Sequence, residues 1–362
     1  MHPYTYWLGF SLIRNLGPKR TLHLANHFTG LESAWRASEA QLIASGLSAQ
    51  FAADVVRQRN EIDLEHEVRR VEAVRARIIP QSAMDYPPLL KPLPDAPTLL
   101  YVRGSLLPGD SRAVCIVGTR KATVYGKDAA YRLAYDLASQ GVTIVSGLAH
   151  GIDSAAHNGA LDAGGRTLAI SGCGISEIYP SDNLDLAHRI IEHGAVITEF
   201  PIGTPPTAKN FPRRNRIMSG MTLGVLVAEA GEKSGSLITA GLAAEQGRDV
   251  FAVPSNIFSQ VGRGTNRLIQ DGAKLVMSAA DVLDEIDTAH EFAETALKTE
   301  RVAPESDVEQ HVLDMLGPDP VHVDDLARLS DLPISQITAT LTLLELKGLA
   351  QSTGPMQYIR SR

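Results

Sequence analysis

Cysteine, aromatic residues and long apolar runs are all scarce in this chain of 362 residues. Its 2 cysteines, Cys115 and Cys173, provide neither a disulfide framework nor a spacing typical of metal ligands. No apolar run is long enough to span a bilayer, and Met1 to Phe10 lacks the basic and apolar regions of an export signal. The sequence therefore predicts a cytoplasmic protein with no membrane segment.

The chain is too long to fold around one hydrophobic core, so we expect several domains. Aromatic residues make up only 5% of it against 44% for all apolar types, which predicts cores built mostly from Ala, Leu, Val and Ile. We expect a helical domain, a proline-rich linker with a lead-in strand, an α/β domain, a second linker and a small terminal domain. These cover residues 1–80, 81–111, 112–287, 288–305 and 306–362.

The formal net charge of −7 argues at first sight against a nucleic-acid partner, but the charge is unevenly distributed. Residues 287–362 hold 6 Lys and Arg against 13 Asp and Glu, whereas residues 1–111 and 112–286 are each nearly neutral. A basic patch in the middle of the chain is therefore compatible with an acidic total.

The first segment opens with helical periodicity at Leu8, Leu12 and Leu16, followed by Gly17-Pro18 and a second periodic run. This pattern is typical of a small bundle of the sterile-alpha-motif or helix-hairpin-helix type. The turn either presents backbone amides to a phosphate or simply joins two packed helices. We expect helix to continue through the charged stretch from Glu61 to Arg77.

In the middle segment short apolar runs alternate with amphipathic stretches at the spacing of βαβ units. The runs are nearly continuous in Val, Ile and Ala, which indicates a parallel sheet that is covered on both faces. They are Val114 to Val117, Val142 to Ser146, Thr167 to Ser171, Ala195 to Thr198, Gly224 to Ala228 and Val250 to Val253. The prediction is a doubly wound, mostly parallel α/β sheet.

Glycine or a small polar residue follows most of these runs, and two of the resulting turns carry cations, Gly118-Thr119-Arg120 and Lys233-Ser234-Gly235-Ser236. A third basic group, the cluster Phe211-Pro212-Arg213-Arg214-Asn215-Arg216, opens the helix that follows the fourth run. Because parallel strands end at one edge of a sheet, we expect these groups to converge there. Guanidinium groups suit phosphate and the Phe211 ring suits an unstacked base, although the arginines could instead form salt bridges within the fold.

Two common nucleotide-binding loops are missing. Gly118 has no glycine two or five positions later, as the dinucleotide fingerprint requires. The segment around Lys233 lacks the preceding glycine of a phosphate-binding Walker loop. Neither a nicotinamide cofactor nor ATP is supported, and we expect no cofactor.

The terminal domain has the pattern of a winged helix. A short strand at Val321 to Val323 lies between helical runs, and a turn at Gly354-Pro355 predicts the wing. The helix that would read DNA, Ser335 to Glu345, offers Gln336 but no Lys or Arg. We therefore interpret this acidic domain as a module for protein interaction or dimer support.

The motifs of the middle segment, taken together and in order, resemble those of the DNA-processing protein A (DprA/Smf) family. Besides the three basic groups above they are Ser146-Gly147-Leu148-Ala149-His150-Gly151-Ile152-Asp153, Gly172-Cys173-Gly174 with Tyr179-Pro180, and Glu199-Phe200-Pro201. The resemblance implies an extended Rossmann fold that binds single-stranded DNA without hydrolysing it. It also implies a homodimer, and loading of RecA recombinase onto incoming DNA in natural transformation and recombination.

Carried over residue by residue, the resemblance assigns DNA contacts to the cations and stacking to Phe211. Glycines and serines of the turns would supply amides or clearance. The implied single-stranded DNA site comprises Gly118, Thr119, Arg120, Gly147, Phe211, Arg213, Arg214, Asn215, Arg216, Lys233, Ser234, Gly235 and Ser236. Sequence-independent binding of this kind needs no catalytic residue, so we expect a protein that is not an enzyme.

Three alternatives stay open. A nucleotide phosphoribohydrolase of Rossmann-like fold would need a carboxylate at the rim, such as Glu199, Glu229 or Asp153, but its Pro-Gly-Gly-x-Gly-Thr-x-x-Glu pattern is missing. A pure protein scaffold would leave the arginine cluster without a role. His150, Asp153 and His157 share one face of a helix, where they either bind a metal or serve as capping and packing residues.

Overall fold

The computed structural model describes residues 4–288, 306–317, 320–330, 332–346, 349–354 and 356–360. The chain divides into two compact units, Met1–His290 and Glu291–Arg362. Each has its own hydrophobic core, and each is described by itself. Most of the second expected linker, residues 289–305, lies outside the described residues.

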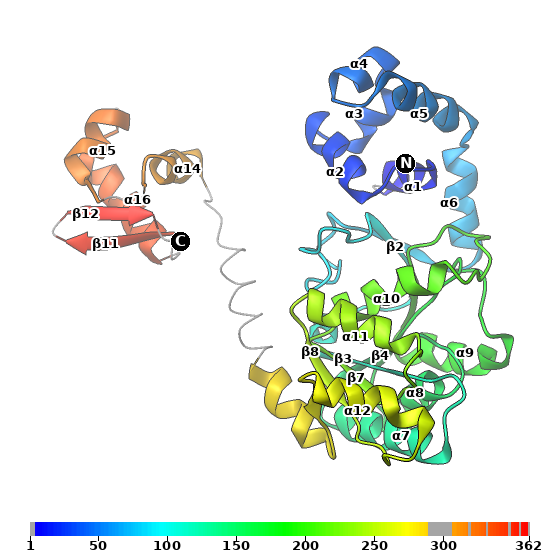
Figure 1. Ribbon diagram of the computed structural model, residues 1–362. Coiled ribbons are helices and arrows are strands. Elements are labelled where there is room, and N and C mark those ends of the chain that lie inside the picture. Colours follow the sequence, from blue (N-terminus) through cyan, green and yellow to red (C-terminus); the bar gives the residue numbers. More distant parts are fainter. Residues whose placement is uncertain are drawn as a thin grey trace. The chain divides into compact units, whose positions relative to one another are not determined.

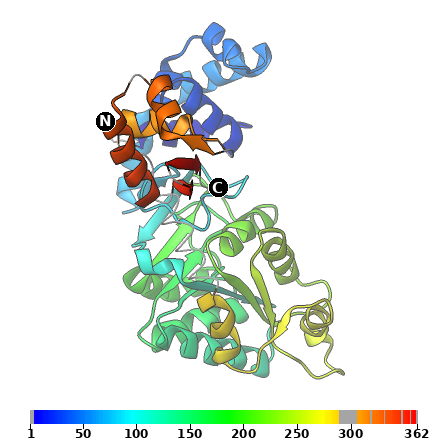
Figure 2. The same cartoon turned by 90° about the vertical axis from the view of Figure 1, so that its left-hand side faces the viewer.

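The N-terminal part of the first unit is a bundle of short helices. They are α1 (Thr5–Leu12), α2 (Pro18–His27), α3 (Leu31–Arg36), α4 (Glu39–Ala44), α5 (Ala49–Glu61) and α6 (Leu64–Ala73). Phe10, Leu24 and Leu42 are fully buried at its centre. Figures 1 and 2 both place this bundle beyond one end of the α/β part.

The expected helix from Glu61 to Arg77 is wrong in its extent. It breaks at Asp63, whose carboxylate accepts a hydrogen bond from the His66 amide and so caps a new helix, α6. After Ala73 the chain turns through Arg75, which adopts a left-handed φ of 52°. It then forms strand β1 (Arg77–Pro80), which pairs antiparallel with β2 (Leu99–Gly104).

The centre of the first unit is a nine-stranded sheet in the order β1-β2-β6-β5-β4-β3-β7-β8-β9. Strands β3 to β9 run parallel, and β2 joins β6 antiparallel. These strands are β3 (Ala113–Gly118), β4 (Thr143–Ser146), β5 (Thr167–Ile170), β6 (Ala195–Thr198), β7 (Gly224–Glu229), β8 (Asp249–Ala252) and β9 (Lys274–Leu275). Each apolar run that predicted a strand forms one, and the predicted fold class is confirmed.

Helices cover the two faces of this sheet. From β3 the chain propagates toward β6 and then returns to add β7, β8 and β9 on the other side. Because parallel crossovers are right-handed, this reversal places the two sets of helices on opposite faces. One set is α7 (Val124–Ser139), α8 (Ile152–Asp162) and α9 (Leu184–His193), and the other is α10 (Asn210–Gly220), α11 (Ser236–Glu245) and α12 (Arg263–Gln270).

The proline-rich stretch before β2 packs into the core and is not a free linker. Tyr86 is 2% exposed and its hydroxyl donates to the Pro97 carbonyl at 2.7 Å. Leu90 is fully buried in the cluster that also contains Cys115 and Val225. Residues 81–98 therefore cover the sheet, because their apolar side chains close its hydrophobic face.

The second unit is a winged helix with its own core around Val312, Leu341 and Leu344. Its three-stranded sheet has the order β10-β12-β11. The elements are α14 (Asp307–Asp314), β10 (Val321–His322), α15 (Val323–Ser330), α16 (Ile334–Leu346), β11 (Ala350–Gly354) and β12 (Gln357–Arg360). Within the described residues of both units, no helix is long and apolar enough to cross a membrane.

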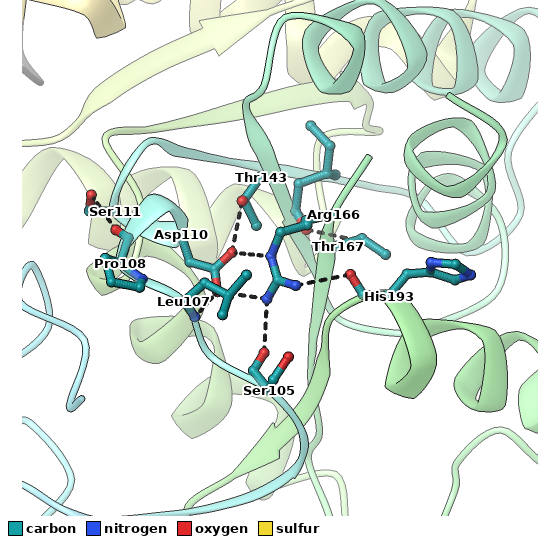
Figure 3. A network of polar contacts seen from close by, with 10 residues as sticks. Ser105, Leu107, Pro108, Asp110, Ser111, Thr143, Arg166, Thr167 and His193 are labelled. Carbon is teal, nitrogen blue, oxygen red and sulfur yellow. Dashed lines mark hydrogen bonds and ion pairs between the residues drawn. The ribbon is translucent and has the colours of Figure 1, made fainter. Parts of the chain in front are cut away.

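A polar network fastens the chain at the end of the sheet where β4 and β5 begin (Figure 3). Asp110 accepts hydrogen bonds from the Thr143 hydroxyl at 2.9 Å and from the Arg166 guanidinium at 2.8 Å and 2.9 Å. Arg166 also donates to the carbonyls of Ser105 and His193. The ion pair thus joins four segments of the chain. Its strength is reduced little by water, because the Asp110 side chain is only 7% exposed.

We expect Asp110→Ala to lower the free energy of unfolding of the first unit by about 3 kcal/mol, because it leaves Arg166 without its buried partner. Urea denaturation followed by tryptophan fluorescence measures this, since both tryptophans, Trp7 and Trp35, belong to that unit. Asp271→Ala removes the exposed pair with Arg267 and should change stability by less than about 1 kcal/mol. Equal losses in the two variants would contradict the structural role of the network.

Candidate functional site

The sheet changes its direction of propagation between β3 and β7, and such a switch point opens a crevice at the carboxyl ends of the strands. A pocket of about 410 Å³ occupies this place. It is bordered by the turns after β3, β4 and β7 and by the first half of α10. Its lining residues are Val117, Gly118, Thr119, Arg120, Lys121, Ala149, Asp153, Phe211, Pro212, Arg214, Asn215, Met218, Ser234, Gly235, Ser236, Ile238 and Thr239.

The half-buried ring of Phe211, in the first turn of α10, is one wall of this pocket. The Tyr179 ring lies 5.7 Å from it, and the Arg120 guanidinium lies over it at 5.0 Å from the centroid. A Cβ atom at Gly172 would come within 2.7 Å of the Phe211 ring, so this position requires glycine. Two aromatic faces and an exposed cation thus stand side by side at the edge of the sheet.

Arg214 lies beneath Phe211 and is only 4% exposed. Its guanidinium donates to the Ile170 carbonyl and lies against Gly147, where any side chain would overlap with it. Burial lowers the pKa of Arg214, and the negative charge of Asp153 acts in the opposite direction. Burial also raises the pKa of Asp153, which accepts a hydrogen bond from the Ala149 amide at 3.3 Å.

The other two arginines of the cluster have different environments. Arg216 is 12% exposed at its side chain and forms ion pairs with Glu199 at 2.6 Å and Asp95 at 3.3 Å. Burial raises the pKa of Glu199, and Arg216 opposes that shift. Arg213 is 62% exposed, lies over the Phe200 ring and stays 3.9 Å from Glu199. Arg213 is therefore the member of the cluster that points its charge toward solvent.

The turn after β7 leads into α11 and adds backbone amides to the pocket. The hydroxyls of Ser234 and Ser236 lie 2.8 Å apart, and the Ser236 amide donates to Ser234 Oγ at 3.4 Å. The next two amides of the first turn of α11 bond within the turn, Leu237 to the Ser234 carbonyl at 3.1 Å and Ile238 to the Gly235 carbonyl at 3.2 Å. Lys233 is exposed beside this turn. A helix N-terminus with a nearby cation is suited to an anion.

The structure brings most of the residues expected in the site together. Those that line the pocket are Gly118, Thr119, Arg120, Phe211, Arg214, Asn215, Ser234, Gly235 and Ser236. Gly147 lies below it against Arg214, while Lys233, Arg213 and Arg216 are outside the lining set. The sequence did not assign Lys121 or Tyr179 to the site, although Lys121 directly follows the motif Gly118-Thr119-Arg120 and Tyr179 belongs to a motif of the resemblance.

His150, Asp153 and His157 do not converge. His150 is exposed, with Nε2 at 3.7 Å from Asp182, whereas the His157 Nδ1 lies 2.6 Å from the Thr167 hydroxyl in the core. Burial lowers the pKa of His157 to about 3, so its ring is neutral at physiological pH. Across the part of the chain that the structure describes, no three His, Cys, Asp or Glu side chains form a group that could hold a metal ion.

Comparison with known proteins gives concordant matches in both units. The model of the family described as DNA recombination-mediator protein A matches residues 77–287, and that of the DprA winged helix domain matches residues 296–354. A protein Smf from Synechocystis is 32% identical over 98% of each chain, and a protein Smf from Escherichia coli is 38% identical over 81% of this chain and 79% of its own.

Two solved structures are also similar. DNA processing protein A from Streptococcus pneumoniae has a TM-score of 0.69 and 35% identity, over 79% of this chain and 99% of its own. DNA processing protein A from Helicobacter pylori has a TM-score of 0.52 and 30% identity, over 62% of this chain and 96% of its own. The H. pylori structure was determined to explain the single-stranded DNA binding mode of that protein.

We expect Gly147→Ala to destabilise the first unit by about 1–3 kcal/mol, because the added methyl group overlaps with the Arg214 guanidinium and displaces it. Thermal unfolding followed by tryptophan fluorescence measures the loss. Gly241→Ala is the matched control: it lies inside α11 with open space around it, and should stabilise slightly. A Gly147→Ala protein as stable as the wild type would show that Arg214 is not tightly held.

Proposed function

Because this chain belongs to the DprA/Smf family, we propose that it binds single-stranded DNA at the pocket on the carboxyl edge of its sheet and loads RecA recombinase onto that strand. The observation that carries the proposal is the Phe211 ring, with Tyr179 beside it and the Arg120 guanidinium over it. The H. pylori relative, which binds single-stranded DNA, supports it.

The physical requirements of such binding agree with the residues present. A strand is held without sequence preference when its bases stack on aromatic faces and its phosphates meet cations and backbone amides. Tyr179 and the guanidinium of Arg120 stacked on Phe211 offer the flat faces, and Arg120, Arg213 and Lys233 offer exposed cations. The positive end of the α11 dipole lies beside Lys233 and also favours a phosphate. None of these roles needs a catalytic group, so we propose a protein that is not an enzyme.

We propose that RecA loading takes place in the cytoplasm, where incoming single strands enter recombination during natural transformation. The support is the family itself, whose model is described as a recombination mediator. Such a mediator must hold the strand firmly enough to protect it and yet release it to the recombinase. Stacking and screened phosphate contacts suit that task, because they are individually weak and reform quickly.

We also propose that the chain forms a homodimer, so that its second partner is another copy of itself. The first unit has an apolar hollow of about 880 Å³ between α7 and the ends of β8 and β9, lined by residues that include Tyr125, Tyr135 and Met277. Tyr125 is 52% exposed and Met277 is 80% exposed. Exposed Tyr and Met side chains around one hollow, with the charged Asp128, Arg132 and Asp136 beside them, are typical of protein interfaces.

The competing reading, a nucleotide phosphoribohydrolase, would require an available carboxylate at the rim. Glu229 is 2% exposed and accepts hydrogen bonds from the amide and hydroxyl of Thr123 at 2.8 Å and 2.6 Å. Glu199 is paired with Arg216, and Asp153 is buried. All three nominated carboxylates have structural partners, which favours binding over hydrolysis.

We expect Phe211→Ala and Arg120→Ala each to weaken binding of a fluorescent oligo-dT about tenfold or more, because a stacked base and a phosphate contact are worth on the order of 1–3 kcal/mol each. Fluorescence anisotropy across a salt series measures both variants. Arg120→Ala should also reduce the salt dependence by about 0.7 in log–log slope for a single strand, while Phe211→Ala should leave it unchanged.

Arg189→Ala is the control for these variants, because it removes a half-exposed arginine on α9 outside the pocket. Its affinity for oligo-dT should equal that of the wild type. Wild-type binding in both Phe211→Ala and Arg120→Ala would place the DNA site elsewhere. A wild-type protein that binds no single strand at all would refute the proposed function, and nucleotide hydrolysis would then be the activity to assay.

We expect a chain that ends at residue 288 to bind oligo-dT as tightly as the full chain, within about a factor of two. The first unit has its own core and contains the whole pocket. The removed unit carries the acidic excess, and its helix α16 has no Lys or Arg. Anisotropy with both proteins at equal concentration measures this, and a loss of tenfold or more would assign DNA binding to the winged helix as well.

A further inference from the structure

The loop between β8 and α12 holds two large apolar side chains in solvent. Ile257 is 75% exposed and Phe258 is 85% exposed. Leaving a Phe side chain in water costs roughly 1.5–3 kcal/mol of free energy relative to burying it fully. Such a ring at the tip of a loop, near a binding pocket, suggests a contact made with a partner.

This exposure does not arise from a loosely attached loop. The Asn266 side chain holds Ser255 of the loop by two hydrogen bonds, since its Oδ1 accepts from the Ser255 amide and its Nδ2 donates to the Ser255 carbonyl, both at 2.9 Å. Farther along, Asn256 Oδ1 accepts from the Phe258 amide at 2.9 Å. Hydrogen bonds therefore fix the backbone that presents Phe258, which reduces the entropy lost when a ligand binds.

The loop is continuous with the pocket on the carboxyl edge of the sheet. The amide of Gly264, in the first turn of α12, donates to the Ala230 carbonyl at 2.7 Å. A Cβ atom at Gly231 would lie 3.5 Å from the Gln260 carbonyl oxygen. The turn that starts at Ala230 contains Ser234 to Ser236, which line the pocket. The surface thus runs from Phe211 across this turn to the loop that carries Phe258.

The charges along this route favour a polyanion. Residues 250–270 contain Arg263 and Arg267 but no Asp or Glu. Lys233 and Arg263 are exposed, and neither forms an ion pair with any residue that the structure describes. Glu232 is the one acidic residue of the turn between Ala230 and Ser236. An exposed aromatic ring and two unpaired cations on these adjoining segments match the chemistry of a single strand, with its alternating bases and phosphates.

We propose that Phe258 is a second stacking platform for single-stranded DNA, reached by the strand after it leaves the Phe211 pocket and crosses the Ser234–Ser236 turn. The proposal rests on the proposed function and extends it: the site holds two base-stacking stations in series. Lys233 and Arg263 contact the phosphates between and beside them. A long oligonucleotide then engages both stations, whereas one of a few nucleotides engages only the first.

The test compares oligo-dT of about 4 and about 20 nucleotides, lengths at and beyond the lower end of single-strand site sizes, by anisotropy. Phe258→Ala should weaken the long oligonucleotide about tenfold and leave the short one unchanged, while Phe258→Trp should retain wild-type affinity for both. Met84→Ala is the matched control, because Met84 is 94% exposed and stands outside this route. It should behave as wild type at both lengths.

Two results would overturn the second station while leaving the first intact. One is Phe258→Ala binding both lengths as tightly as the wild type does. The other is a change in the molar mass of Phe258→Ala by light scattering, with unchanged affinity per chain, which would assign the loop to a protein interface. A wild-type protein without affinity for either length would instead refute the proposed function, and the second station with it.

Discussion

The rim of the pocket depends on the buried guanidinium of Arg214. Its contact with the Ile170 carbonyl ties α10 to the end of β5, and its position under Phe211 sets the height of that ring. A guanidinium removed from water is unfavourable by several kcal/mol unless charge and hydrogen bonds offset the loss. Asp153 and the Ile170 carbonyl provide that offset, and Gly147 and Gly172 leave the space that the guanidinium and the ring need.

The three arginines of one short cluster consequently have three different roles. Arg214 is a buried support, Arg216 joins α10 to Glu199 and Asp95, and Arg213 keeps its charge in solvent. Only an exposed guanidinium can exchange water for phosphate without breaking a contact within the protein. Of the three arginines of the cluster, only Arg213 is therefore an exposed cation at this edge, where Arg120 and Lys233 are exposed as well. The cluster acts mainly by placing Phe211 in front of Arg120.

The sequence predicted the parallel strands well because unbroken Val, Ile and Ala runs need cover on both faces, and few other structures supply it. It missed β1 because Arg77 to Pro80 is short, follows an amphipathic helix and gains its strand conformation only by pairing with β2. The sequence also could not predict that Arg213, Arg214 and Arg216 have three different environments. They depend on the distant Gly147, Glu199 and Asp95, and helical spacing within α10 does not reveal which of these each arginine meets.

The acidic total of this chain and a polyanionic ligand are compatible for a physical reason. Charges in solvent at physiological salt are screened beyond about 8–10 Å, so a strand responds to the groups it meets and not to the net charge. At the carboxyl edge those groups are Arg120, Lys121, Arg213 and Lys233 against the exposed Glu232, while Glu199 and Glu229 are engaged with Arg216 and Thr123. Because these two carboxylates are buried and bonded, cations outnumber acids among the exposed groups of this edge, which makes it suitable for phosphate.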